Sequence, residues 1–151
     1  MQDDCLFIEN NDMVDVKIYY RMKNKKCQAL TEEEFKKMDA KSQKEKEKAA
    51  FKKEAFNELN LKMKELSWGL YNELQEAATE STEGGERLFN YRKYRENKFE
   101  KLLVSWDARD ASGNVAKTNP NIIKKLPPEV PDAALRGYDT FSFLDKESEK
   151  N

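Results

Sequence analysis

Hydrophobic and polar residues alternate along one stretch near the start of the chain. The apolar members of this pattern are Val14, Val16, Ile18 and Tyr20. A period of two with β-branched residues is typical of a half-buried strand. A short apolar run at residues 5–8 comes before it, and residues 10–12 (Asn-Asn-Asp) have turn chemistry. We therefore predict a β-hairpin within residues 1–30.

A charged helix is predicted next. Thr31 followed by Glu34 has the spacing of a capping box, which marks a helix start. Residues 39–48 contain no large apolar side chain, and their Lys and Glu residues recur at helical neighbour spacing, so a solvated helix is expected. Leu59, Leu61 and Met63 then alternate with polar residues, which fits either a second strand or the end of this helix.

Two longer amphipathic helices are predicted in the middle of the chain. Ser67 can cap the first, over residues 68–79, and Asn90 can cap the second. Apolar residues keep helical spacing from Tyr91 to Trp106, so the second helix is expected to reach Trp106. Residues 79–86 between the two helices contain two glycines and are predicted to be a loop.

Two further helices are expected near the end of the chain. Asn119 followed by Pro120 is a helix start, and the prolines at 127 and 128 end that short helix. A last helix covers about residues 131–138. The predicted fold is α+β and helix-dominated, an N-terminal β-hairpin with three to four helices. The chain divides into the hairpin (1–30), the Lys/Glu-rich helix (31–58), a helical module (59–140) and a tail (141–151).

Composition limits the size of the core. Charged residues make up 38% of the 151 residues, and mean hydropathy is -1.00, although aromatic residues reach 11%. We expect a small core with solvated segments around it. The net charge of -1 gives no overall attraction to nucleic acid or membrane. The basic stretch at residues 17–26 could contact phosphate, but a solvated strand end and loop is the favoured interpretation.

The sequence lacks the residues that several kinds of catalytic and metal site require. The chain has no histidine and two cysteines, which argues against Ser-His or Cys-His catalysis and against a zinc site. The glycines at 84 and 85 are not followed by the Lys-Ser/Thr of a P-loop. Aligning Gly113 with the sixth position of an EF-hand loop puts Ala108 first and Asn119 twelfth, so a tight turn is favoured. We predict no enzymatic activity, no cofactor and no metal. An acidic start without a following apolar run, and no stretch of about 20 apolar residues, predict a cytosolic protein without a membrane span.

The middle and end of the chain carry a series of motifs. In order these are ELSWGLYNELQEAA, an acidic glycine-containing loop, RLFNYRKYRENKFEKLLVSWDA, a DASGN turn and NPNIIKKLPPEVPDAALRGYD. This series, over residues 55–140, resembles the small tail assembly chaperones of long-tailed bacteriophages. The matching positions are Trp68, Gly69, Asn72, Glu73, Trp106, Asp107, Leu126, Pro127, Pro128 and Val130. The resemblance implies a tail protein of the tape-measure type as the client, and a location in the cytoplasm of the infected host or in the virion.

The sequence offers candidate partner-binding residues and competing interpretations. The candidates are Tyr91, Tyr94, Phe99, Trp106, Phe141 and Phe143. Core packing is the favoured role for Trp68 and Trp106, because large aromatics at helix ends usually anchor a core. The aromatic cluster after residue 140 is either a docking peptide or, as favoured, a cover for the core. Besides an assembly chaperone, we consider a minor virion protein of the tail, baseplate or head–tail joint, with self-association, and a less favoured nucleic-acid-binding protein.

Overall fold

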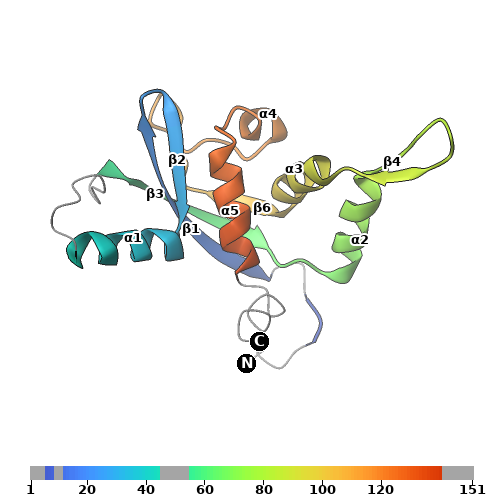
Figure 1. Ribbon diagram of the computed structural model, residues 1–151, viewed down its shortest axis with the longest axis horizontal. Helices are drawn as coiled ribbons and strands as arrows, with labels where there is room; N and C mark the ends of the chain where they lie inside the picture. The colour runs from blue at the N-terminus through green and yellow to red at the C-terminus, as the bar shows by residue number, and fades with distance from the viewer. Residues whose placement is uncertain (1–5, 9–11, 45–54, 141–151) are drawn as a thin grey trace.

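A four-stranded antiparallel sheet forms the centre of the molecule, with strand order β2-β1-β3-β6 (Figure 1). The computed structural model describes residues 6–8, 12–44 and 55–140. The strands of this sheet are β1 (Met13–Lys23), β2 (Lys26–Thr31), β3 (Asn57–Lys64) and β6 (Leu103–Trp106). Two short strands, β4 (Thr79–Ser81) and β5 (Arg87–Phe89), pair separately. The helices are α1 (Glu32–Lys44), α2 (Trp68–Ala77), α3 (Tyr91–Leu102), α4 (Pro120–Ile123) and α5 (Glu129–Asp139).

The N-terminal hairpin joins β1 to β2, so the hairpin partner predicted at residues 5–8 is wrong. Residues 24 and 25 connect the strands with φ of 54° and 65°. Two left-handed residues in a two-residue loop match the right-handed twist of paired strands. Leu6, Phe7 and Ile8 lie outside the sheet and are exposed. The alternating pattern therefore predicted β1 correctly. Its partner β2 was missed because the turn at residues 24 and 25 contains no glycine.

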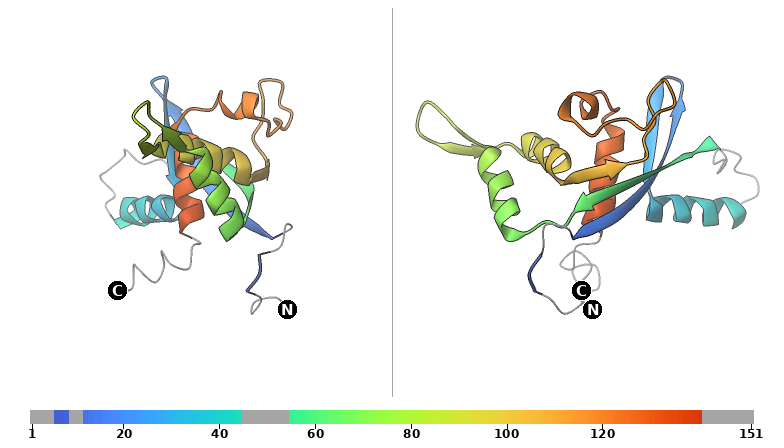
Figure 2. Two further views of the ribbon diagram at one scale, coloured as in Figure 1. Left: turned by 90° about the vertical axis from the view of Figure 1, so that its right-hand side faces the viewer. Right: turned by 180° about the vertical axis from the view of Figure 1, so that it is seen from behind.

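The core lies on one face of the sheet. Successive side chains of a strand point to opposite faces, so Val16 and Ile18 of β1 and Leu61 and Met63 of β3 are buried on the same side. Burying each such side chain stabilises the fold by about 1.5–3 kcal/mol. Helices α3, α4 and α5 cover this face, as two views show (Figures 1 and 2). Helix α5 crosses β1 and β2 closely at Gly137, where an added Cβ would lie 3.2 Å from Val16 Cγ1.

Helix α1 begins where β2 ends and touches the other face of the sheet. The predicted capping box is present, with the Thr31 amide donating to the Glu34 carboxylate at 2.9 Å and the Glu34 amide donating to Thr31 Oγ1 at 3.1 Å. Phe35 stacks on Tyr19 with 3.8 Å between ring centroids. The Glu34 carboxylate also pairs with Arg136, which ties α1 to α5. The described part of this helix ends at Lys44, and residues 57 and 58 already belong to β3.

The prediction of a helix-dominated fold with three to four helices is wrong. The described residues contain a four-stranded antiparallel sheet and five helices, with 31% strand and 41% helix. Helix α3 ends at Leu102 rather than Trp106, because Leu103–Trp106 pairs with β3. The apolar positions 102, 103 and 106 fit both a helix and a short strand, so spacing did not separate them. The predicted loop at residues 79–86 contains β4 and the turn that leads to β5.

Candidate protein-binding surface

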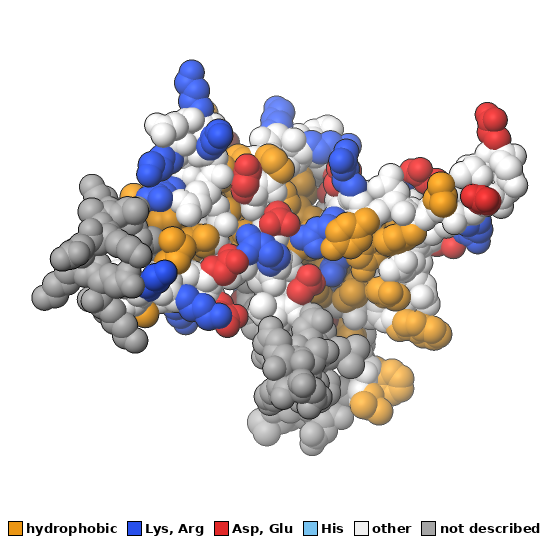
Figure 3. Space-filling model, viewed as in Figure 1, with side chains coloured by type: hydrophobic (Ala, Val, Ile, Leu, Met, Phe, Trp, Pro, Cys, Tyr) orange, Lys and Arg blue, Asp and Glu red, His pale blue; other side chains and the backbone are white. Residues whose placement is uncertain are grey.

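Four aromatic side chains are exposed on α2, the β4–β5 hairpin and α3, at one end of the molecule. They are Trp68 (80% exposed), Tyr71 (39%), Phe89 (46%) and Tyr91 (61%), and we call them the aromatic surface. Figure 3 shows hydrophobic side chains gathered over this end of the molecule. Contiguous apolar patches that remain exposed on a folded chain mark binding sites more often than scattered apolar residues do.

Local helix caps place these side chains. The Leu70 amide donates to Ser67 Oγ at 3.2 Å, so α2 begins at Trp68, and Tyr71 follows on the neighbouring face one turn later. The Lys93 amide donates to Asn90 Oδ1 at 3.1 Å, which makes Tyr91 the first residue of α3. Both caps were predicted from the sequence. Each sets the first residue of a helix, and that residue carries an exposed aromatic side chain.

Tyr94 is the buried centre of the aromatic surface. Its ring centroid lies 5.5 Å from that of Phe89 and 6.5 Å from those of Tyr71 and Tyr91. With Leu74 and Ala78 it forms a small core separate from the main one. Burial raises the pKa of the Tyr94 phenol above its ordinary value of 10.0. Three rings of the aromatic surface, Tyr71, Phe89 and Tyr91, therefore lie against a buried side chain.

The β4–β5 hairpin is held against the two helices and extends away from them (Figures 1 and 2). Arg87 pairs with Glu76 of α2 at 2.6 Å, and the Asn90 amide donates to the carbonyl of Ala78 at 2.8 Å. Phe89 pairs with Thr79 at the base of the hairpin. This base is consequently the part of the hairpin that is fixed to the aromatic surface.

A groove continues from the aromatic surface along α3. Tyr91 is at one end of this groove of about 970 Å³, which lies between α3 and the α4–α5 segment. Its apolar lining includes Phe99, Ile123 and Leu135. Arg95 lies on its rim, donates to the Tyr91 hydroxyl at 3.2 Å and pairs with an α5 carboxylate. The groove and the aromatic surface share Tyr91, so one extended ligand can contact both.

The predicted partner-binding residues have different positions in the structure. Tyr91 is exposed, whereas Tyr94, Phe99 and Trp106 are buried and support the fold. Trp106 lies opposite Leu61 in the sheet, and its indole N–H donates to the carbonyl of Ala116 at 2.7 Å. The candidates Phe141 and Phe143 lie outside the described residues.

The residues matched to the tail assembly chaperones also divide into exposed and buried sets. Both tryptophans were expected in the core, but Trp106 is 7% exposed and Trp68 is 80% exposed. Gly69, Asn72, Glu73 and Pro128 are exposed, Leu126 and Pro127 are half-buried, and Val130 is buried. Asp107 accepts two hydrogen bonds from Asn60, both of 2.8 Å.

The sequence contained one unused signal for the aromatic surface. The apolar stripe of α2 runs through Leu70 and Leu74, which are at i, i+4. Trp68 and Tyr71 add a second apolar pair at i, i+3, more than one face of a ten-residue helix can bury. Excess apolar residues beside a complete inner stripe indicate a contact with something outside the domain.

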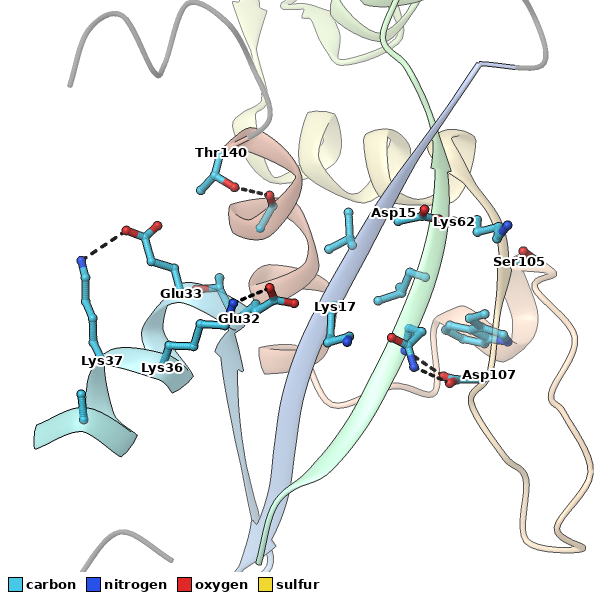
Figure 4. A pocket seen from close by; sticks show the side chains of 17 residues that line it. Asp15, Lys17, Glu32, Glu33, Lys36, Lys37, Lys62, Ser105, Asp107 and Thr140 are labelled. Carbon is cyan, nitrogen blue, oxygen red and sulfur yellow. Dashed lines mark hydrogen bonds and ion pairs between the residues drawn. The ribbon is translucent and has the colours of Figure 1, made fainter. Parts of the chain in front are cut away.

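A second concavity, of about 1130 Å³, extends from α1 and the end of α5 across β1 to β3 and β6 (Figure 4). Most of its charged side chains have a partner. The ion pairs are Lys17–Glu58 (3.0 Å), Lys36–Glu32 (3.0 Å) and Lys37–Glu33 (3.4 Å). Within residues 6–8, 12–44 and 55–140, no group of three His, Cys, Asp or Glu side chains is placed to hold a metal ion.

None of the helices in the described ranges has the length and apolar character needed to cross a membrane. The turn at Gly113 is the tight turn predicted from the sequence, with Asp110 accepting from the amides of Ser112 and Asn114.

Comparisons of the chain with protein-family models, with curated proteins and with solved structures gave no match.

Proposed function

We propose that this chain is a non-enzymatic bacteriophage morphogenesis protein, similar to a tail assembly chaperone, that binds a tail protein of the tape-measure type before polymerisation. The observation that carries the proposal is the aromatic surface. Three large rings lie against Tyr94, and Trp68 is exposed one turn before Tyr71 on α2, although the main core of this small, highly charged protein is complete without them.

The aromatic surface has properties that favour protein binding. Trp and Tyr provide large contact areas with few rotatable bonds, and they are enriched among the residues that dominate binding energy. The adjoining groove has an apolar floor and a charged rim, which suits the apolar face of an amphipathic helix. A long helical tail protein with exposed apolar stripes is the kind of client that such a surface can shield.

The first experiment is affinity purification of the tagged protein from infected cells, combined with mass spectrometry of purified virions. We expect one elongated tail protein to be recovered from lysate, and the chain itself to be absent from virions. A fixed number of copies in the virion would contradict the chaperone function and indicate a structural subunit of the tail, baseplate or head–tail joint.

Matched variants test whether the aromatic surface is responsible. Trp68→Ala combined with Tyr91→Ala should abolish recovery of the client. Met22→Ala is the control, because Met22 is 59% exposed on the β1–β2 hairpin, remote from α2. Circular dichroism should show both variants folded. Equal client recovery by the two variants would exclude the aromatic surface as the binding site.

A further inference from the structure

Strand β1 extends beyond its neighbour β2 at the N-terminal end of β1. β3 pairs with Met13–Tyr20, but β2 pairs only with Ile18–Lys23. Within the described ranges, no strand lies beside Met13–Lys17 on the β2 side. The row of β2 is interrupted because Thr31 is followed directly by α1. This leaves an open edge of five residues, about 17 Å long, in the middle of the molecule.

The pairing pattern shows which backbone groups face this open edge. In an antiparallel sheet, alternate residues direct both N–H and C=O to the same neighbouring strand. The Glu65 amide donates to the Asp12 carbonyl at 3.2 Å, so the even-numbered residues of β1 face β3. The two-residue turn after Lys23 independently makes the odd-numbered residues face β2. Met13 and Asp15 therefore direct both their N–H and C=O groups to the open edge. Lys17 directs its N–H there, whereas its C=O faces the amide of Glu32, as the pairing of Ile18 with Thr31 requires.

The open edge borders the 1130 Å³ concavity. Asp15, Val16 and Lys17 line it from β1, and Glu32 and Gly137 line it from the start of α1 and the end of α5 (Figure 4). The concavity continues across β1 to β3 and β6, so only the part between β1, Glu32 and Gly137 lies beside the open edge.

We propose that the open edge of β1 is a second binding site, which takes a short extended segment of a partner protein as an added strand in the row of β2. A row of outward N–H and C=O groups selects an extended backbone, because only that backbone meets them in register. The site is separate from the aromatic surface and does not depend on the proposed function.

Side chains around the open edge define the chemistry of the segment. On the core side, an added residue would meet Val16, Thr31 and the Cβ-free backbone of Gly137, which suits an apolar side chain. On the outer side, Asp15 has no ion pair among the described residues, whereas Lys17 pairs with Glu58. Opposite charges across neighbouring strands stabilise the pair. The segment therefore alternates apolar residues with a Lys or Arg placed opposite Asp15.

A second copy of this chain does not fit through the same edge. Two β1 strands paired antiparallel with Asp15 opposite Lys17 would put residue 14 of one copy opposite Ile18 of the other, where Thr31 already lies. Centring the pair on Asp15 would oppose two carboxylates, which is destabilising. An isolated peptide segment avoids both conflicts.

Backbone amide exchange followed by NMR on the full chain tests the open edge first. In the free protein, the amides of Asp15 and Lys17 should exchange quickly, and those of Val14 and Val16 slowly. Equal protection of all four would mean that another part of the chain covers the edge, which would overturn the proposal.

Titration with a synthetic peptide of sequence Thr-Val-Lys-Val-Thr tests binding. Saturable shifts should appear at the amides of Asp15 and Lys17, with affinity on the order of millimolar. The same peptide with alternate N-methylated amides should not bind, and a Lys-to-Glu version should bind about threefold more weakly. Absence of shifts with the first peptide, or equal shifts with the N-methylated one, would refute strand addition.

Two substitutions at one position separate the backbone from the charge. Asp15→Ala should weaken binding about threefold, because it removes only the carboxylate. Asp15→Pro should abolish binding, because it also removes the outward N–H, while the bonds of β1 to β3 remain. Circular dichroism verifies that both variants fold. If Asp15→Pro is folded and binds as well as Asp15→Ala, the added strand does not use this edge.

Discussion

The two tryptophans allow one substitution to be compared in two environments. Trp106 is 7% exposed in the main core, and Trp68 is 80% exposed on the aromatic surface. Trp106→Ala removes the largest side chain from β6, which typically costs about 3–5 kcal/mol through lost burial and the cavity that remains. It also removes the hydrogen bond to the Ala116 carbonyl. Because Ala116 is only half-buried, water can replace that bond, and its loss adds less than about 1 kcal/mol.

The expected destabilisation by Trp106→Ala is therefore about 4 kcal/mol. Trp68→Ala should change the free energy of unfolding by no more than about 0.5 kcal/mol. Urea unfolding followed by far-ultraviolet circular dichroism measures both. With a denaturant slope of about 2 kcal/mol per molar, the midpoint should fall by about 2 M for Trp106→Ala and hardly move for Trp68→Ala.

Either of two results for the tryptophan variants would contradict this reasoning. A loss below about 1 kcal/mol for Trp106→Ala would show that β6 does not anchor the core as described. A loss above about 1.5 kcal/mol for Trp68→Ala would show that Trp68 is packed, and would remove it from the aromatic surface. Trp106→Phe is an intermediate variant, because it keeps an aromatic ring and loses only the indole N–H and some volume.

Three further predictions concern packing, capping and alkaline pH. Gly137→Leu should destabilise the fold by about 1–3 kcal/mol through overpacking against β1. Gly69→Ala should be neutral or stabilising by up to about 1 kcal/mol, because no atom lies within 4 Å of the new Cβ. Thermal unfolding of both variants measures the difference. Thr31→Ala should cost about 1 kcal/mol by removing the acceptor for the Glu34 amide, and Thr31→Ser should restore most of the stability in urea titrations. Burial raises the pKa of Tyr138 to about 12 from the ordinary value of 10.0. The contribution of Tyr138 to stability is therefore complete below pH 10 and should be lost as the pH rises toward 12. Urea midpoints across that range should fall less steeply for Tyr138→Phe than for the wild type.

Controls for the grouped predictions use the same assays. If Gly137→Leu were as stable as wild type, the close approach of α5 to β1 would be incorrect. Equal stability of the Ala and Ser variants at position 31 would show that the cap does not hold α1. An unchanged pH slope in Tyr138→Phe would assign the alkaline loss to another group.

Some features followed from the sequence because they depend on neighbouring residues. The caps at Thr31, Ser67, Asn90 and Asn119 all form as predicted, since a cap requires only a side chain and an amide two or three residues later. The strand character of β1 followed from its period of two. The tight turn before Gly113 followed from turn chemistry.

Other features were decided by tertiary structure. The pattern at Leu59, Leu61 and Met63 fitted a strand or a helix end, and pairing with β1 resolved it as β3. Residues 102–106 fitted a helix, but the edge of β3 drew Leu103–Trp106 into the sheet. Pairing partners lie far apart in the chain, so local spacing does not contain them.

The candidate site shows the same division. Sequence alone identified the chain's aromatic residues and the helices that carry them, because apolar spacing and caps are local. It did not separate the buried Tyr94 and Phe99 from the exposed Trp68 and Phe89, because burial depends on which elements pack together. The open edge of β1 was likewise invisible in the sequence. It exists because β2 ends at Thr31 while β3 continues, and only the assembled sheet determines the relative lengths of its neighbours.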